Sequence, residues 1–452
     1  MKSYNLFLVV NVIICICLLL AFSIYLGGRE SRNSSMDYVK KINNEESTND
    51  QRIAKNNPHT KTFDSSRRIN VRAARENEYR SLNEILGYLK DKMPEEFLNT
   101  TIDELRSMKE LDLSSCDIDD EGLKLIFKLS WLEGLDLSFT EVTNEGLKYL
   151  TGNNSLKFLG LSGTQITDEV LSHLSQSISL ESLSLIDSPL TSQGLKELAK
   201  NTSLKDLYLT DAEVTDDGLK YLSESNSLTH LNLAGTEVTD EGLKHLSQSE
   251  SLTRLHLSGT ELTDESLKHL SQIRSLQELN LGKIGKQITD EGLKHLSQIN
   301  SLKKLNMGTA EVTDGVLRSL SQNKSLTHLG LSSSLATEEG LKYLSQINSL
   351  KKLYLVSPQF TNGIVKELSQ LKTLTHLSLG ETNVTDEGLK ALSKNKFLTS
   401  LYLHDTKVSD EGLRSLSQNA SLRNLYLERS KVTKEGVKEL QQALPDCRIV
   451  HR

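Results

Sequence analysis

The chain has 452 residues, of which 37% are hydrophobic, 25% are charged and only 5% are aromatic. This composition excludes a protein with many membrane spans and predicts a core of aliphatic side chains. The formal net charge of −7 argues against general nucleic-acid binding, which needs a basic face to neutralise phosphates. The four cysteines suggest neither a disulfide framework nor a closely spaced set of metal ligands.

An apolar run occupies residues 6–26 and is interrupted only by Asn11 and Ser23. As a helix it would be about 31 Å long, enough to cross a bilayer. A signal peptide normally has a shorter apolar region, about 7–15 residues, and a small-x-small cleavage site. The longer run and the poor cleavage context favour an uncleaved single-pass anchor within residues 1–28; a cleaved signal and a secreted protein are the alternative. The positive-inside rule would keep the bulk of the chain in the cytoplasm, whereas short N-terminal anchors often leave the bulk outside. The side of the membrane therefore stays open, with the extracellular side slightly favoured.

Residues 29–75 are polar, with 11 Lys or Arg against 6 Asp or Glu, and lack aliphatic periodicity. We expect a disordered, flexible linker, because such a segment buries too little apolar area to offset the entropy of ordering it. Residues 76–107 then predict a helical N-terminal cap. Thr101 and Glu104 have the spacing of a capping box, and apolar residues recur on one helical face at Leu82, Ile85, Leu86 and Leu89.

From residue 108 to the C-terminus at residue 452, one unit repeats. Its intervals are all 24 residues except one of 26, which neither helix nor strand periodicity produces. The leading apolar residue of each unit is Met108, Leu132, Leu156, Leu180, Leu204, Leu228, Leu252, Leu276, Leu302, Leu326, Leu350, Leu374, Leu398 or Leu422. The chain therefore predicts a solenoid of about 14 repeats.

The unit at residues 228–251 shows the local logic. Leu231 and Leu233 alternate as in a short strand and point to one face. Thr239 stands where a helix N-cap belongs, and acidic residues follow it in the first turn, where the helix dipole favours negative charge. Fourteen units carry a good N-cap residue at this position, Asp119 in the first and Thr or Ser in the rest.

A second row of mostly small residues follows each strand. It predicts a sharp turn with room only for small side chains, whose hydroxyl groups can bond to the turn backbone. Cys116 stands in this row, where we expect it to be buried. On the helices, acidic and basic residues four apart, such as Asp240 and Lys244, predict surface ion pairs.

These residues resemble the leucine-rich repeat family: Leu-x-x-Leu-x-Leu followed by Val/Ile-Thr-Asp-Glu-Gly-Leu. The resemblance is closest to the cysteine-containing, F-box-associated subclass, because residues 111–116 read Leu-Asp-Leu-Ser-Ser-Cys. It covers about 345 residues, although the units are shorter than usual for that subclass and most lack the cysteine. It implies an α/β solenoid, a horseshoe with a parallel β ribbon on the concave face, here preceded by a transmembrane helix, a disordered linker and capping helices.

The variable positions around each Leu-x-Leu should line the concave face and bind a partner. Tyrosine and histidine gather there, at Tyr208, His230, His256, His328, Tyr354, His376, Tyr402, His404 and Tyr426. The last five come from four successive units, so we expect one C-terminal patch. Tyrosine is enriched in interfaces, whereas simple tolerance of Tyr and His on an exposed sheet is the alternative.

Catalysis and cofactor binding are not expected. The candidate residues recur at repeated positions, and no Ser-His-Asp or Cys-His set stands out. Histidines on neighbouring strands stay nearly parallel, whereas metal ligands must converge within about 2.1 Å of one ion. Residues 282–287 superficially resemble a phosphate-binding loop but have the wrong spacing.

The sequence thus predicts a membrane-tethered module, held through residues 6–26, that binds a protein partner on its concave face. The alternative is the substrate-recognition subunit of a ubiquitin ligase. That alternative would need an F-box in residues 76–107, whose sequence does not resemble one.

Overall fold

The computed structural model describes residues 63–150, 153–282, 288–332 and 335–451, with side chains from residue 77 onward. The chain divides into two compact units, Met1–Arg80 and Ser81–Arg452. All of the repeats lie in the second unit. The apolar run at residues 6–26 and the expected linker up to residue 62 lie outside the described residues. Within the described part, no helix is both long and apolar enough to cross a membrane.

Fifteen strands form one parallel sheet in which each strand pairs with the next along the chain. The strands are β1 (Glu110–Asp112), β2 (Gly134–Asp136), β3 (Phe158–Gly160), β4 (Ser182–Ser184), β5 (Asp206–Tyr208), β6 (His230–Asn232), β7 (Arg254–His256), β8 (Glu278–Asn280), β9 (Lys304–Asn306), β10 (His328–Leu331), β11 (Lys352–Leu355), β12 (His376–Ser378), β13 (Ser400–Tyr402), β14 (Asn424–Tyr426) and β15 (Arg448–Val450).

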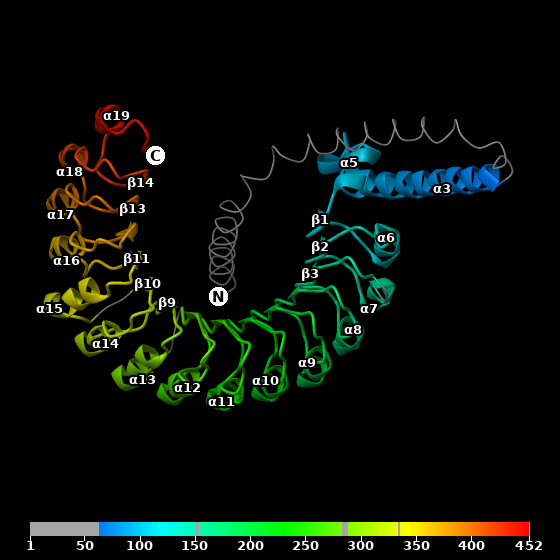
Figure 1. Cartoon of the computed structure of the whole chain (residues 1–452), viewed down its shortest axis with the longest axis horizontal. Helices are drawn as coiled ribbons and strands as arrows, with labels where there is room; N and C mark the ends of the chain where they lie inside the picture. The colour runs from blue at the N-terminus through cyan, green and yellow to red at the C-terminus, as the bar shows by residue number, and fades with distance from the viewer. Residues whose placement is uncertain (1–62, 151–152, 283–287, 333–334, 452) are drawn as a thin grey trace, which may run out of the picture. The chain divides into compact units, whose positions relative to one another are not determined.

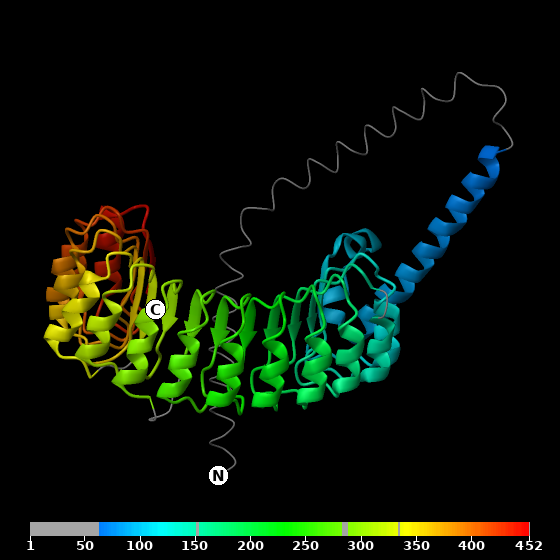
Figure 2. The ribbon, with the colours of Figure 1, turned by 60° about the horizontal axis from the view of Figure 1, so that its bottom comes forward.

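A helix follows each of the first fourteen strands. The helices of the second unit lie on the outer side of the curved repeat array, and the strands line its inner side (Figure 1). In a second view, the outer row of helices comes forward and stands side by side in front of the strands (Figure 2). The repeat helices are α6 (Asp120–Ile126), α7 (Asn144–Leu147), α8 (Asp168–Leu174), α9 (Ser192–Leu198), α10 (Asp216–Leu222), α11 (Asp240–Leu246), α12 (Asp264–Leu270), α13 (Asp290–His295), α14 (Asp314–Leu320), α15 (Glu338–Leu341), α16 (Asn362–Leu368), α17 (Asp386–Leu392), α18 (Asp410–Leu416) and α19 (Lys434–Ala443), with short 3-10 turns η1 (Lys148–Leu150), η2 (Leu296–Gln298) and η3 (Lys342–Gln346).

The core is a ladder of leucines shared by neighbouring repeats. Leu231 and Leu233 of β6 and Leu243 of α11 are fully buried, and Leu246 is 1% exposed. Burying one such side chain stabilises the fold by about 1.5–3 kcal/mol relative to leaving it in water. Because each repeat covers the leucines of the next, stability accumulates along the stack.

Every predicted helix start is confirmed, since each repeat helix has the expected residue as its N-cap. The Asp residues that follow have a different role from the expected one. The Asp216 carboxylate accepts hydrogen bonds from the next N-cap, Thr239, at 2.8 Å from its backbone N–H and 2.6 Å from its hydroxyl. The same pair of hydrogen bonds joins Asp120 to Thr143, Asp168 to Thr191, Asp264 to Thr289, Asp314 to Thr337, Asp386 to Ser409, and Asp410 to Thr433.

The prediction that Asp and Lys four residues apart form ion pairs on the helices is therefore wrong for most of these pairs. Lys244 pairs instead with Glu241 at 3.0 Å, three residues earlier. Lys268 and Lys294 likewise pair with the Glu three residues earlier. The Asp carboxylates face the next repeat, which leaves the Glu nearest to the lysine.

The glycine of the Asp-Glu-Gly motif has a steric reason. A Cβ at Gly242 would lie 2.4 Å from Oδ1 of Asp216 in the preceding repeat. Without a side chain at this point, the carboxylate can approach the helix N-terminus. In α12 the same position holds Ser266, whose hydroxyl bonds to Asp240 instead.

The small row after the strands is confirmed as a buried turn. The Thr236 side chain is 4% exposed, and its hydroxyl donates to the Leu233 carbonyl at 2.7 Å. Gly235, just before it, has φ +71°, a left-handed conformation that glycine adopts without strain. Cys116 differs from the expectation because it is only partly buried; it stands in the first repeat, where the turn has no preceding repeat to cover it.

The N-terminal cap comprises α3 (Phe63–Lys92), α4 (Pro94–Phe97) and α5 (Ile102–Ser107). The four predicted apolar residues of α3 are buried, and Thr101 forms the predicted capping box with Glu104. Helix α3 begins at Phe63, so residues 63–75 are helical and the expectation of a linker there is wrong. A helix nucleated on a buried apolar face extends outward at little cost, because adding a residue is far easier than starting a helix.

Candidate binding surface

The sheet holds the predicted surface residues in register, so residues far apart in sequence become neighbours. Tyr354 of β11 is level with Ser378 of β12, which is level with Tyr402 of β13 and then Tyr426 of β14. Neighbouring strands lie about 4.8 Å apart. The predicted C-terminal patch is therefore continuous across four strands, with Ser378 as a small residue inside it.

Two tyrosines of this patch stack face to face. The rings of Tyr402 and Tyr426 have centroids 4.5 Å apart and planes within 5° of parallel. Burial raises the pKa of Tyr402 to about 12, with help from Tyr426 and Tyr354. Tyr354 remains 40% exposed. The stack is a rigid platform beside an exposed ring, a combination typical of binding anchors.

A shallow hollow of about 440 Å³ opens beside the stack. It is lined by Tyr402, His404, Tyr426, Glu428 and Arg429. Aromatic surface, a guanidinium and a carboxylate thus meet at one place on the concave face. Such a mixture of apolar and charged groups suits recognition of a polypeptide.

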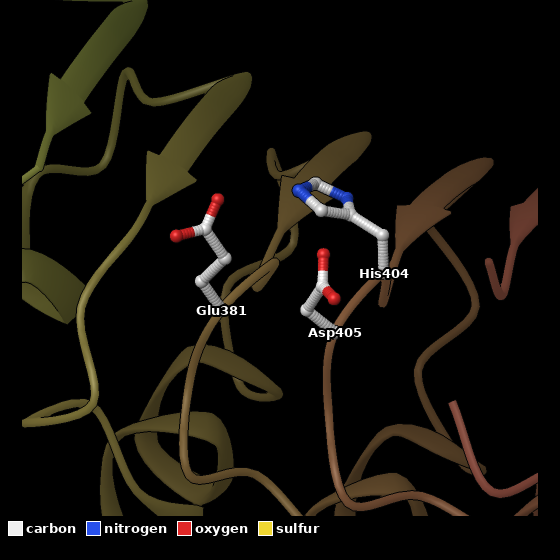
Figure 3. A group of neighbouring side chains, drawn as sticks. All are labelled: Glu381, His404 and Asp405. Carbon is white, nitrogen blue, oxygen red and sulfur yellow. The ribbon is translucent and has the colours of Figure 1, made fainter. Parts of the chain in front are cut away.

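At the rim of the hollow, three potential ligand residues come together. Figure 3 shows the imidazole of His404 above the Asp405 carboxylate and reaching toward Glu381. Their ligand atoms lie within 4.8 Å of one another, the only such group of three in the part of the chain that the structure describes. The His404 ring passes where a Cβ on Gly380 would lie, so only glycine leaves room for it.

This cluster differs from the expectation that only parallel histidines would be available, because the turn residues contribute carboxylates. Arg429 already binds Asp405, with Nη2 2.5 Å from Oδ2. A metal ion would have to compete with that guanidinium for the same carboxylate. We therefore assign the cluster to the charged rim of the patch.

A second aromatic cluster lies in the middle of the sheet. Tyr208 contacts His230 edge to face with centroids 5.0 Å apart, and His230 contacts His256 at 5.1 Å. His230 is only 5% exposed, so its imidazole offers little surface to a partner in this structure. The Arg254 guanidinium reaches from β7 past β6 to Asp206 of β5 at 2.7 Å, which helps to cover the imidazole.

In the central cluster, the charges of Arg254 and Asp206 neutralise each other. Asp206 Oδ1 also lies 3.4 Å from Nδ1 of His230, and neither ring nitrogen of His230 has a hydrogen-bond partner among the described atoms. Burial, and to a smaller extent the neighbouring His230, lower the pKa of His256 to about 4. His256 is therefore neutral at pH 7, and little charge remains for a partner.

Four lysines between these two clusters were missed by sequence reasoning. They occur as Leu-Lys-Lys-Leu in two repeats, giving Lys303, Lys304, Lys351 and Lys352. Two predicted residues, His328 and His376, stand between and beside them. The doubled lysine at positions that elsewhere vary was the available signal.

The predicted surface residues thus fall into three groups: a central, self-paired cluster with Tyr208, His230 and His256; a middle group with His328 and His376 among lysines; and the C-terminal patch of Tyr354, Tyr402, His404 and Tyr426. His376 was predicted to belong to the C-terminal patch, but it is level with Lys352 and is therefore grouped with the lysines.

A parallel solenoid with one strand and one outer helix per 24-residue unit defines the class of protein. The leucine-rich repeat family model matches residues 104–127, 128–150, 200–223, 224–247, 248–271, 370–393 and 394–417. These seven segments are leucine-rich repeats. Residues 76–107 give no support for an F-box.

Two solved structures are similar over most of their length. An internalin of Listeria monocytogenes is 20% identical, with 78% of this chain and 91% of that chain covered and a TM-score of 0.44. A leucine-rich repeat protein of Leptospira interrogans is 24% identical, with 77% and 91% covered and a TM-score of 0.49. The curated proteins include no match.

Proposed function

We propose that this protein binds another protein on the concave face of its repeats, with the C-terminal patch as the main contact. The observation that carries this proposal is the stacked pair Tyr402 and Tyr426 beside the exposed Tyr354. Tyrosine supplies a large contact area at a small cost in side-chain entropy. The neighbouring hollow adds polar groups that can give specificity.

Binding rather than catalysis is the proposed activity. The hollow is open, and its polar groups, Glu428 and Arg429, stand beside aromatic surface at the concave edge. Such a site suits a polypeptide side chain better than a small substrate, which enzymes usually enclose. Leucine-rich repeat proteins generally mediate protein–protein interaction.

The proposal includes a membrane tether. Its support is the apolar run at residues 6–26, long enough for one span. If the run is an anchor, the full chain should sediment with membranes at high pH and high salt, and a chain lacking residues 1–28 should not. A mature N-terminus beginning after residue 26 would instead identify a cleaved signal.

The test of binding uses the full chain as bait for proteins of its own cells, in quantitative affinity capture. Replacing Tyr354, Tyr402 and Tyr426 together by alanine should remove the specific partner. The matched control replaces three tyrosines outside the sheet, Tyr149 in η1, Tyr221 in α10 and Tyr343 in η3, and should retain it. A partner kept equally by both triple variants would refute the proposed site.

Once the partner is purified, we expect the patch variant to bind at least a hundredfold more weakly, because each anchor contributes on the order of 1–2 kcal/mol. Circular dichroism of both variants checks that the repeats remain folded.

A further inference from the structure

A basic strip crosses the concave face between the central cluster and the C-terminal patch. It consists of Lys303, Lys304, His328, Lys351, Lys352 and His376. On the sheet, Lys304 is level with His328, His328 with Lys352, and Lys352 with His376. Lys303 and Lys351 come just before strands β9 and β11. Four strands thus present basic side chains over about 15 Å.

Most of this positive charge is not neutralised within the protein. Lys304 pairs with Glu278 at 2.9 Å. Within the described part of the chain, the Lys303 ammonium donates to the neutral amide oxygen of Gln277 and forms no ion pair. Among the described residues, neither Lys351 nor Lys352 forms an ion pair. Three lysine charges therefore face solvent without a carboxylate, in a chain whose net charge is −7.

Outside the strip, the lysines at the same positions of the described sheet form ion pairs. Glu133 bridges Lys109 and Lys157 on the neighbouring units, and Lys205 pairs with Glu181 at 2.8 Å. The same inter-strand spacing could have placed a carboxylate beside Lys352. The sequence places histidine on both sides instead.

The two histidines respond to this positive field. The pKa of His328 is lowered to about 4 by burial and then by Lys352 and Lys304. The pKa of His376 is lowered by burial and by Lys352. Thr327 and Thr375 bond to the Nδ1 atoms of these histidines at 2.8 and 2.9 Å and fix the rings. Both imidazoles are thus neutral at pH 7; His328 lies between Lys304 and Lys352, and His376 lies beside Lys352.

We propose that the basic strip binds an extended acidic segment of the protein partner, beside the C-terminal patch. This inference rests on the proposed function and names the chemistry of the partner. Lys351 and Lys352 would pair with carboxylates of the segment. Tyr354, two residues after Lys352 on β11, would contact a neighbouring side chain of the segment. Opposite charges steer such a segment onto the strip and fix its register.

The spacing of the strip selects a pattern in the segment. Lys304 and Lys352 are two strands apart, about 9.6 Å, and three residues of extended chain span about 10 Å. Acidic residues three apart in the partner would therefore meet successive lysines. A carboxylate limits the strip at one end, where Glu278 of β8 is level with Lys304, which favours a short acidic segment over a long polyanion.

The probe is a fluorescein-labelled peptide with four glutamates, each separated by Gly-Ser, measured by fluorescence anisotropy with the full chain at low salt. We expect saturable binding that weakens as salt rises. Lys351→Glu with Lys352→Glu should weaken it at least tenfold. Lys220→Glu with Lys390→Glu, on the outer helices, changes the net charge equally and should leave it within twofold.

Lys351→Arg with Lys352→Arg, which keeps both charges, should bind within threefold and shows that folding is intact. Equal peptide binding by the Lys351/Lys352 reversal and its control would overturn the proposal. So would tighter binding of a single-stranded oligonucleotide of equal charge, because the strip would then recognise phosphates.

Capture of the cellular partner separates this proposal from the proposed function. If the lysine reversal keeps the partner and the tyrosine triple variant loses it, the acidic segment is refuted and the binding patch stands. If the tyrosine variant also keeps the partner, the binding patch itself is refuted. Loss in both variants supports both proposals.

Discussion

The central cluster on β5–β7 and the basic strip on β9–β12 belong to one sheet, yet charges are paired in the cluster and mostly unpaired in the strip. In the centre, Arg254 reaches two strands to pair with Asp206. In the strip, Lys352 has histidine on both sides and no carboxylate partner among the described residues. The comparison teaches that position on the concave face does not by itself make a residue available. Availability depends on whether a neighbouring repeat supplies the opposite charge.

The largest expected effect tests whether the central charges are structural. Arg254→Met removes the 2.7 Å pair and leaves the Asp206 carboxylate beside the buried His230. We expect a loss of about 1–2 kcal/mol, near the lower end for charged hydrogen bonds because the Arg254 side chain is 42% exposed. The midpoint of urea unfolding measures it.

Lys352→Met is the matched control for that variant. It should change stability by less than about 0.5 kcal/mol, as surface substitutions without a partner usually do. Equal losses of stability in the two variants would show that charges in the central cluster are no more structural than charges in the basic strip.

A second prediction concerns pH. The pKa of His256 is about 4 in the folded chain against an ordinary value of 6.5. Below pH 6.5 the unfolded chain gains a proton that the folded chain does not, so stability should fall as pH decreases from 6.5 to about 4. His256→Gln should show a shallower fall over this window in urea unfolding at a series of pH values. An unchanged slope would show that His256 titrates normally.

The smallest expected effect is a pKa change at a single histidine of the basic strip, with a histidine of the central cluster as the reference. Lys352 lowers the pKa of His328, whereas His256 responds to other charges. Lys352→Met should therefore raise the pKa of His328 and leave that of His256 in place. Titration of the imidazole signals by NMR measures both in one sample. A pKa shift at both histidines, or at neither, would contradict the conclusion that the Lys352 charge acts on His328 alone.

Much of the fold was predictable because its signals are local. Thr239 predicts its helix start through hydrogen bonding within two residues, and Leu231 and Leu233 predict a strand by alternation. The C-terminal patch was also predictable, since a constant interval places Tyr402 and Tyr426 on adjacent strands. The burial of His230 was not predictable, because it depends on a guanidinium 24 residues further along the chain.

The repeat length, the helix starts, the buried leucines and the row of side chains on the concave face could all be derived from the amino-acid sequence. Each of these follows from backbone hydrogen bonding and apolar periodicity within one unit. Three features required the folded structure: Asp216 binds the next repeat rather than Lys220, His230 is covered, and Lys351 and Lys352 form no ion pair with a described residue. Those outcomes depend on the reach of side chains between strands and helices that only stacking brings together.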